Sequence, residues 1–516
     1  MHQRLTAYSL TLVFSFFVGW GVAQERLVIA YEGGGVTLDP HMRTENTTWS
    51  WQRHIFDTIT WLDREGELEP RIAVSWDNVD PTEWHLEVRN DVTFHDGTTM
   101  TAEDVAFSIE RAATHPRSEK RLFVGQVVES EAIDDYTVRV VTRDPDPVLP
   151  LNLAHIGVVP KAMLEDIGDE AFARDPIGTG PYRFISWQED EQLDLEVYEE
   201  YWGPRPDFDS VRLTNIPSGS ARLAALLTGE VQVAQKILPQ DFPRVEDDPN
   251  TYLSSTPGIR VIYMTMDYWR ESGSDGLAAD MENPFLDRRV RQAVYQAIDV
   301  DAIVDIIMEG AATPATQLAP PAVEIHDPDL ERLPYDPDAA RELLAEAGYE
   351  DGFTLRFDAP NDRYLNDEFV AEAVAGMLQE VGLEAQVNAE TRTVFFPRID
   401  EGNYTMFLAG WGWPSPYATI VGFLHCRDDD LGLGSFNRAR YCNPEVDELL
   451  AEAASSFDDE ARIEVARQAL YRANREDFAW IPLYYENVIE GVQSHIEWQS
   501  RPDEFIFAFE MQRGGE

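Results

Sequence analysis

Residues Glu83–Ala113 read EWHLEVRNDVTFHDGTTMTAEDVAFSIERAA, and this stretch decides the fold. Trp84, Leu86 and Val88 alternate with charged or polar residues, which is the period-two pattern of a half-buried strand. His95-Asp96-Gly97 then favours a turn, because Asp can bond the nearby backbone and Gly tolerates positive φ. The first part of the stretch therefore predicts a strand followed by a tight turn.

The second part of the stretch predicts a helix. Thr101 is a suitable N-cap, and Asp104 three residues later gives a near capping box. Val105, Ile109 and Ala112 fall on one helical face, as in an amphipathic helix. Strand-turn-helix units of this kind are common in many folds. The identity of the protein family therefore has to come from the particular residues of this stretch.

The string Glu83–Ala113 resembles, nearly residue for residue, the signature segment of extracytoplasmic solute-binding proteins of family 5, which serve peptide, opine and nickel ABC transporters. Pro176–Tyr182 (PIGTGPY) and Tyr201–Pro206 (YWGPRP) also resemble that family. The glycines and prolines of PIGTGPY predict a sharp crossover of the backbone. The motifs occur in the order of the family and cover almost the whole chain after the N-terminal segment.

Helices and strands alternate along the rest of the chain, which predicts an α/β fold. A strand-helix-strand unit at 211–216, 221–227 and 231–234 predicts a crossover connection. Further strands are expected at 27–31, 136–141, 354–357, 384–387, 404–410 and 481–488, and a helix at 366–381.

The resemblance implies a periplasmic-binding-protein type II fold with two lobes and an extra inserted domain. We expect a discontinuous lobe I at 24–60, 180–275 and 485–516, the inserted domain at 61–179, and lobe II at 276–484. A chain of 516 residues is consistent with about three domains.

The formal net charge of −53 limits the possible partners. Such an acidic chain should repel nucleic acid and anionic membrane surfaces, so we expect neither as a partner. Exposed charges that lie beyond the Debye length, about 8 Å at physiological salt, barely act on a ligand. We interpret the charge as favouring solubility in a salty medium, with a cationic ligand as the alternative.

The N-terminus predicts a Sec-type signal peptide at residues 1–23. Arg4 supplies the positive charge, residues 10–18 form a short apolar core, and Ala23 ends a small-residue cleavage site. The apolar run is shorter than the roughly 20 residues of a membrane span. No cysteine follows the site for a lipid anchor, so we expect a soluble exported protein in the periplasm.

The sequence contains two cysteines, Cys426 and Cys442. In an oxidising compartment this spacing favours a disulfide, with two buried free thiols as the alternative. Closing the loop would stabilise the fold by about 3 kcal/mol at best.

Residues Gly410–Tyr417 (GWGWPSPY) are the predicted ligand-contact stretch. They follow an expected strand end, which is where α/β sheets place ligands. Trp411, Trp413 and Tyr417 predict a rigid aromatic surface that can stack on rings or cations, although both tryptophans could instead belong to the core. In relatives that bind peptides, an Asp pairs with the α-amino group at the position of Pro414, and this departure counts against the ordinary mode of peptide recognition.

Four further residues are ligand-binding candidates: Asn437, Arg438, His41 and Arg363. Asn437 and Arg438 belong to a family-like segment expected to line the same cleft. Arg438 or Arg363 would suit an acidic ligand group, because Arg can clamp a carboxylate with two hydrogen bonds. His41 follows a family-like turn, where a pocket wall, a metal ligand and a structural role are all open.

Catalytic signatures are missing from the sequence, which has no G-x-S-x-G, H-E-x-x-H, C-x-x-C or P-loop motif. The ten His residues show no metal-ligand spacing, so we expect no enzyme activity, no metal and no cofactor. The abundant carboxylates leave an exported glycoside hydrolase as one rival hypothesis. A sensor or chaperone that keeps the fold but feeds no transporter is the other.

The resemblance therefore implies the substrate-binding component of an ABC importer, which we expect to be a monomer. A small solute would be captured between hinged lobes and delivered to the permease subunits in the membrane. An oligopeptide or related peptide-type ligand is the first expectation. An opine, an oligosaccharide or a metal chelate are the alternatives.

Overall fold

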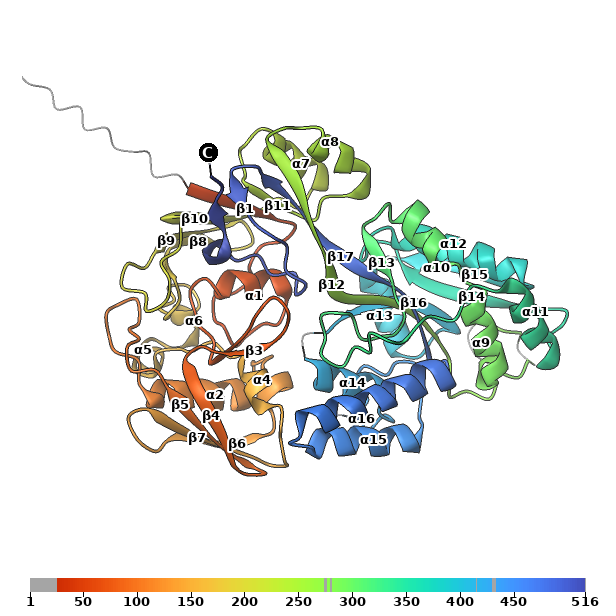
Figure 1. Ribbon diagram of the computed structural model, residues 1–516, viewed down its shortest axis with the longest axis horizontal. Coiled ribbons are helices and arrows are strands. Elements are labelled where there is room, and N and C mark those ends of the chain that lie inside the picture. Colours follow the sequence, from red (N-terminus) through yellow and green to blue (C-terminus); the bar gives the residue numbers. More distant parts are fainter. Residues whose placement is uncertain (1–25, 273–275, 279–280, 414, 429–432, 516) are drawn as a thin grey trace, which may run out of the picture.

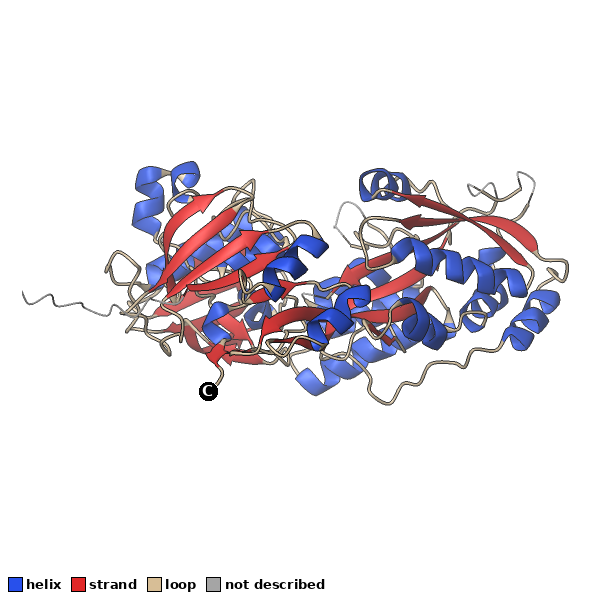
Figure 2. Cartoon of the chain, turned by 90° about the horizontal axis from the view of Figure 1, so that it is seen from above, coloured by secondary structure: helices blue, strands red, loops and turns tan. Residues whose placement is uncertain are grey.

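The structure is a computed structural model that describes residues 26–272, 276–278, 281–413, 415–428 and 433–515. Figure 1 shows two halves joined by two long strands, β12 (Thr251–Met266) and β17 (Trp480–Gln493). We call residues 26–256 with 488–515 lobe I, and residues 261–484 lobe II. Seen from above in Figure 2, the lobes lie side by side with the long strands crossing between them.

Lobe I contains a sheet centred on β1 (Arg26–Tyr31). This strand lies between β10 (Ser210–Asn215) and β11 (Val233–Gln235) and is parallel to both. Helix α7 (Gly219–Leu227) connects β10 to β11, which confirms the predicted crossover. The other elements of this part are α1 (Asn46–Gln52), β2 (Thr60–Leu62), β3 (Leu68–Pro70), β8 (Tyr182–Gln188), β9 (Gln192–Val197), a 3₁₀ turn (Pro239–Asp241), α8 (Phe242–Glu246), β18 (Ile496–Glu497), a second 3₁₀ turn (Ala508–Glu510) and β19 (Gln512–Arg513).

A second, smaller sheet lies in the first lobe, and Figure 1 shows it at the end far from β1. Its strand order is β4 (Ala73–Asp80), β5 (Glu83–Val88), β7 (Thr137–Thr142) and β6 (Val127–Ala132), with all neighbours antiparallel. Helix α2 (Ala102–Thr114) packs on β6 and β7. Four short helices complete this part: α3 (Arg121–Val124), α4 (Leu149–Leu153), α5 (Lys161–Ile167) and α6 (Asp169–Phe172).

The strand and helix predicted from Glu83–Ala113 are β5 and α2. The predicted capping box is present, with the Thr101 backbone N–H donating to the Asp104 carboxylate at 2.9 Å. Val105 and Ile109 are fully buried, as their helical spacing indicated.

The turn at His95 binds the second family-like stretch. The backbone N–H of Gly178 donates to His95 Nδ1 at 3.3 Å, and His95 Nε2 bonds the Gly180 carbonyl at 2.9 Å. A Cβ on Gly178 would lie 2.1 Å from the Ile55 carbonyl oxygen, so this glycine is needed for close backbone approach. Two motifs that are far apart in sequence thus form one joint next to α1.

Lobe II continues the large sheet in the order β12, β16 (Met406–Gly412), β14 (Phe353–Pro360) and β15 (Leu383–Glu390). β14 is parallel to both of its neighbours, whereas β16 is antiparallel to β12. The other elements of lobe II are a 3₁₀ turn (Pro284–Leu286), α9 (Arg288–Gln296), α10 (Val300–Ala302), a π-helical turn (Ile303–Ile307), β13 (Ala312–Pro314), α11 (Pro337–Glu346), α12 (Asp367–Glu380), α13 (Arg392–Asp400), α14 (Pro416–Leu424), α15 (Pro444–Ser455), α16 (Asp459–Tyr471) and a second π-helical turn (Arg472–Glu476).

The pairing of the two long strands is interrupted between the lobes. The register of β12 against β17 shifts between Pro257 and Val261, as in a β-bulge. Bulges bend a strand and increase its twist. On β17 the shift lies at 485–487, beside the expected domain boundary at 484/485. On β12 it lies at 257–261, upstream of the boundary expected at 275/276.

The lobes touch each other at two places outside the hinge strands. Ser415 Oγ of lobe II donates to Asn152 Oδ1 of lobe I at 3.2 Å. Trp84 and Phe457 meet with ring centroids 6.2 Å apart. These contacts make the conformation a closed one.

Candidate functional site

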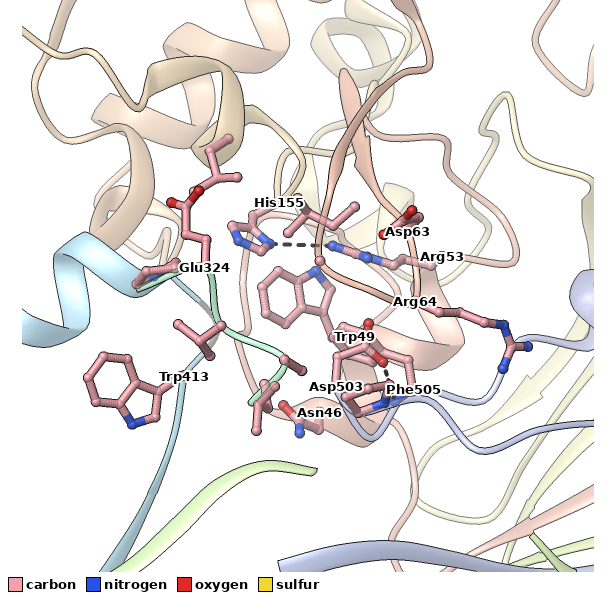
Figure 3. A pocket seen from close by; sticks show the side chains of 18 residues that line it. Asn46, Trp49, Arg53, Asp63, Arg64, His155, Glu324, Trp413, Asp503 and Phe505 are labelled. Atoms are coloured by element: carbon pink, nitrogen blue, oxygen red, sulfur yellow. Dashed lines mark hydrogen bonds between the residues drawn. The ribbon is translucent and has the colours of Figure 1, made fainter. Parts of the chain in front are cut away.

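An enclosed cavity of about 80 Å³ lies between the lobes, and both lobes line it. Figure 3 shows Trp413 and Glu324 on one side and Trp49, Arg53 and His155 on the other. Lobe I also contributes Asn46, Asp63, Arg64, Asp503 and Phe505, and lobe II also contributes Val323 and Pro416.

The wall from lobe I is built on the short helix α1. Glu45 caps this helix by accepting the backbone N–H groups of Thr47 and Thr48, both at 2.9 Å. This fixes Trp49 on the helix and Arg53 at its C-cap. The Trp49 ring packs edge-on against Phe505 with centroids 5.5 Å apart, so the C-terminal segment holds the wall in place.

Arg53 is only 4% exposed, although it lines the cavity. Its Nη2 donates to the Ala154 carbonyl at 2.8 Å and lies 3.4 Å from His155 Nδ1. Burial lowers the pKa of the Arg53 guanidinium to about 9, because a charged group loses hydration there. The group is therefore still charged at neutral pH.

The wall from lobe II is the segment after β16. The backbone N–H of Trp413 donates to the Ile259 carbonyl at 3.1 Å, which ties the segment to β12. The Trp413 side chain is 3% exposed, and its Nε1 has no hydrogen-bond partner. Glu324 lies beside it, and burial raises the pKa of this carboxyl.

A second cavity of about 100 Å³ lies at the hinge. Arg260 of β12 forms ion pairs there with Glu504 at 2.9 Å and Glu486 at 3.3 Å. Lys236 pairs with Glu32 at 3.1 Å on the lobe I side. We call this the hinge cavity, and the first one the wall cavity.

Glu504 connects the two cavities. It accepts a hydrogen bond from Asn46 Nδ2 at 2.8 Å, and Asn46 lines the wall cavity. The same carboxylate binds Arg260 in the hinge cavity. A polar path therefore links the hinge strands to the wall of lobe I.

The three predicted aromatic residues do not act as one surface. Trp413 lines the wall cavity, as described above. Trp411 instead packs on Phe436 with ring centroids 4.2 Å apart, within the lobe II core. Tyr417 is also buried, beneath the guanidinium of Arg462 at 5.1 Å. Pro414 lies outside the described residues.

The two other lobe II candidates from the family-like segment lie in a loop. Asn437 is fully buried, and its amide donates to the carbonyls of Tyr441 at 2.6 Å and His425 at 3.0 Å. Arg438 pairs with Asp400 at 2.5 Å. Cys426 and Cys442 form a disulfide beside this loop, so the segment is held by its own contacts and lines neither cavity.

The remaining candidates lie at separate places. His41 is fully buried, with Nδ1 2.8 Å from Arg111 and Nε2 2.9 Å from the Gly157 carbonyl. Burial lowers the pKa of His41 to about 4, so the ring is neutral within this network. Arg363 lines the hinge cavity, which it shares with none of the other predicted site residues.

Sequence reasoning missed the lobe I wall. Trp49, Arg53 and His155 lie on short helices or at their ends and show no motif in sequence. Only the contact of α1 with the C-terminal segment brings them to the cavity. The WSWQRH run of aromatic and basic residues at 49–54 in so acidic a chain was the one available signal.

The described part of the chain contains no feature that indicates metal binding or membrane insertion. No three His, Cys, Asp or Glu residues described here are grouped so that they could hold a metal ion. No described helix is long and apolar enough to cross a membrane.

Two lobes that close on a cavity, joined by strands shared between both, define a two-lobed binding protein of the periplasmic type II class. Solved structures share this fold. The substrate-binding protein CtaP of Listeria monocytogenes superimposes with a TM-score of 0.83 at 23% identity, covering 95% of this chain and 99% of that one. DppA of Helicobacter pylori in complex with the peptide STSA gives 0.75 at 23% identity, covering 95% and 98%. These likenesses confirm the predicted α/β fold.

Sequence comparison gives the family. The profile described as "Bacterial extracellular solute-binding proteins, family 5 Middle" matches residues 67–430, and the chain belongs to this family. The glutathione-binding protein GsiB of Shigella dysenteriae is 28% identical over 503 residues, which cover 95% of this chain and 94% of the relative. Binding proteins of this family work outside the cytoplasm and deliver their ligand to ABC permeases, which confirms the predicted class of function.

Proposed function

We propose that the protein captures a peptide-type solute in the wall cavity and delivers it to the permease of an ABC importer. The observation that carries this proposal is a cavity with an indole on each lobe, Trp49 and Trp413. Aromatic rings on two moving walls can hold a ligand only when the walls approach each other. Relatives that are named for glutathione support a short peptide as the ligand class.

The mechanism is a population shift between open and closed lobes. Bending at the register shift in β12 separates the walls, and a ligand that contacts both walls favours the closed form. Moving closure from 1:99 to 99:1 requires a preference of about 5.5 kcal/mol for the closed state. Two stacked indoles and a few buried hydrogen bonds are of the right order to supply it.

The domain division and the location belong to the same proposal. Residues near 61–179 form the inserted domain of lobe I, and the signal peptide at 1–23, which lies outside the described residues, is removed near Ala23. The mature protein is a monomer in the periplasm with no catalytic activity. N-terminal sequencing and light scattering test cleavage and mass, and turnover of a chromogenic glycoside would contradict the last point.

Calorimetric titration with glutathione, dialanine and trialanine tests the function. We expect at least one of these to bind the wild type and to compact it in small-angle X-ray scattering. Trp413→Ala should weaken that binding by 10-fold or more, since it removes one of the two rings that hold the ligand, roughly 1.4 kcal/mol or more.

The matched control is Trp269→Ala, because Trp269 is 47% exposed on lobe II and lines neither cavity. It should bind as the wild type does. Equal losses in both variants, or saturation without any change in scattering, would contradict the proposal.

A further inference from the structure

The wall cavity is lined by Arg53, a buried cation that forms no salt bridge with any described residue. Arg53 has no carboxylate within salt-bridge distance among the described residues, although Asp63, Asp503 and Glu324 line the same cavity. Leaving a buried charge unpaired is costly, and proteins generally pair such groups or bind them to a ligand. In a chain with 94 acidic residues, the missing partner is a specific feature of this site.

The nearby carboxylates are held by other groups. Asp503 pairs with Arg501 at 2.8 Å. Asp63 accepts the backbone N–H groups of Glu65 at 2.9 Å and Glu67 at 2.8 Å. Both carboxylates are thus engaged with other groups and form no salt bridge with Arg53, although the charge of Asp503 favours the protonated form of Arg53.

Three aromatic rings surround Arg53 and leave part of its hydrogen-bonding capacity unused. The guanidinium carbon lies 4.8 Å from the Phe505 centroid, 5.1 Å from Trp49 and 5.4 Å from Trp61. Rings bind the face of a guanidinium, whereas its N–H groups point outward in its plane. The hydrogen bonds of Arg53 within the described residues all run through Nη2, and Nε has no partner.

A second buried basic side chain lies against the same indole. Lys120 is fully buried, its Nζ lies 3.3 Å from the Trp49 ring centroid, and Nζ has no hydrogen-bond partner. Arg53 and Lys120 repel each other, as the lowered pKa of the Lys120 amine reflects after burial. Arg53 and Lys120 thus place two basic side chains against the Trp49 ring of the lobe I wall.

We propose that Arg53 binds a carboxylate of the transported solute, so that the ligand is a carboxylate-bearing molecule whose acidic group docks on lobe I. This inference rests on the proposed function. A planar carboxylate can accept in-plane hydrogen bonds from the guanidinium between the flanking rings, and it would form the salt bridge that Arg53 lacks among the described residues.

The first experiment compares each probe with a form in which its carboxylates are blocked. Glutathione is titrated against glutathione diethyl ester, and trialanine against its C-terminal amide. For a probe that binds the wild type, we expect blocking to weaken affinity by about 10- to 100-fold, as for hydrogen bonds to a charged group. Arg53→Gln should remove this preference.

Arg43→Gln is the matched control, because it removes the same charge from lobe I at a surface pair with Glu119. It should keep the preference. If Arg53→Gln still prefers the free carboxylate over the blocked form, and near-ultraviolet circular dichroism shows that the variant is folded, the inference is overturned. The next measurement uses the wild type alone.

The second experiment measures thermal stabilisation of the wild type by glutarate, glutaramide and inorganic phosphate. Stabilisation by glutarate above both others supports the inference, whereas equal effects or a larger effect of phosphate overturns it. Glutarate binding without any peptide binding would overturn the proposed function alone. Glutathione and its ester binding equally would overturn the carboxylate assignment alone.

Discussion

The two cavities between the lobes treat charge in opposite ways. In the hinge cavity Arg260 forms ion pairs with both Glu486 and Glu504. In the wall cavity the more deeply buried Arg53 forms no salt bridge with any described residue. Paired ions fix the geometry of the groups that carry them. A buried ion without a partner can instead be stabilised by a ligand of opposite charge. The difference supports a structural role for the hinge cavity and the proposed binding role of the wall cavity.

The hinge pairing also explains why the lobes stay connected when they move. Arg260 belongs to β12, Glu486 to β17, and Glu504 to the segment that reaches Asn46 on the lobe I wall. One guanidinium thus ties both hinge strands to the base of the binding wall.

The largest expected effect is that of Arg260→Gln on stability. The change leaves Glu486 and Glu504, whose side chains are 18% and 25% exposed, without their shared counter-ion, which should cost about 3 kcal/mol of unfolding free energy. Burial already raises the pKa of Glu486, and Arg260 opposes that rise. Protonation of these carboxyls should reduce the destabilisation of the variant. In urea denaturation, its loss of unfolding free energy should therefore be larger at pH 8 than at pH 5.

Arg205→Gln serves as the control for this variant. Arg205 pairs with Glu199 and Asp209 at the surface, where such pairs contribute at most about 1 kcal/mol. If Arg260→Gln were no more destabilised than Arg205→Gln, the hinge cavity would not be the structural one.

A second large effect concerns a buried acid at the hinge that has no cation. Glu490 of β17 accepts from Trp498 Nε1 and from Ser500 Oγ at 3.0 Å, and its Oε1 has no partner. Burial raises the pKa of Glu490 to about 7. The folded state therefore holds a proton that the unfolded chain, with an ordinary pKa of about 4.3, has released.

Stability should consequently fall as the pH rises through this window, because the folded state binds more protons there. Glu490→Gln should remove that contribution and stabilise the protein at pH 8 by on the order of 3 kcal/mol, with little gain at pH 4. The measurement is the difference between the two unfolding free energies as a function of pH. A difference that does not change with pH would show that Glu490 is charged in the fold.

The elements of the fold could be predicted from sequence where their signals are local. Thr101 and Asp104 cap α2 through contacts three residues apart, and the alternation in β5 follows the burial of its side chains. Gly178 is different, because its close approach to the Ile55 carbonyl joins distant parts of the chain. The two-lobed arrangement was therefore implied by the resemblance to family 5 and not by any local pattern.

The site could be predicted only in part, because it depends on tertiary contacts. Trp411 and Trp413 are two residues apart, so strand alternation would place them on one face. β16 ends at Gly412, however, and Trp413 leaves the sheet for the cavity while Trp411 packs on Phe436. Arg53 reaches the cavity through packing of α1 on the C-terminal segment, which no local pattern encodes.

A smaller effect is expected at the contact that holds the lobes closed. Ser415→Ala removes the hydrogen bond to Asn152 across the lobes. It should destabilise only the closed form, by about 1 kcal/mol, and so weaken ligand affinity by roughly 5-fold. Ser455→Ala, which removes a bond within α15, should leave affinity unchanged. A faster ligand off-rate in Ser415→Ala would place the loss in closure, and identical kinetics in both variants would exclude this contact as a latch.

The smallest effect is expected from Arg363→Gln, and it is the most direct test of the difference between the cavities. Arg363 lines the hinge cavity with its guanidinium 5.2 Å from the Tyr364 ring centroid, and it is only partly buried. A partly hydrated cation that does not contact the ligand should contribute at most about 1 kcal/mol, so affinity should change by less than roughly 5-fold. An acidic ligand clamped by Arg363 would instead lose 10-fold or more in the same calorimetric titration. That result would move the ligand to the hinge and reverse the roles of the paired and unpaired cavities.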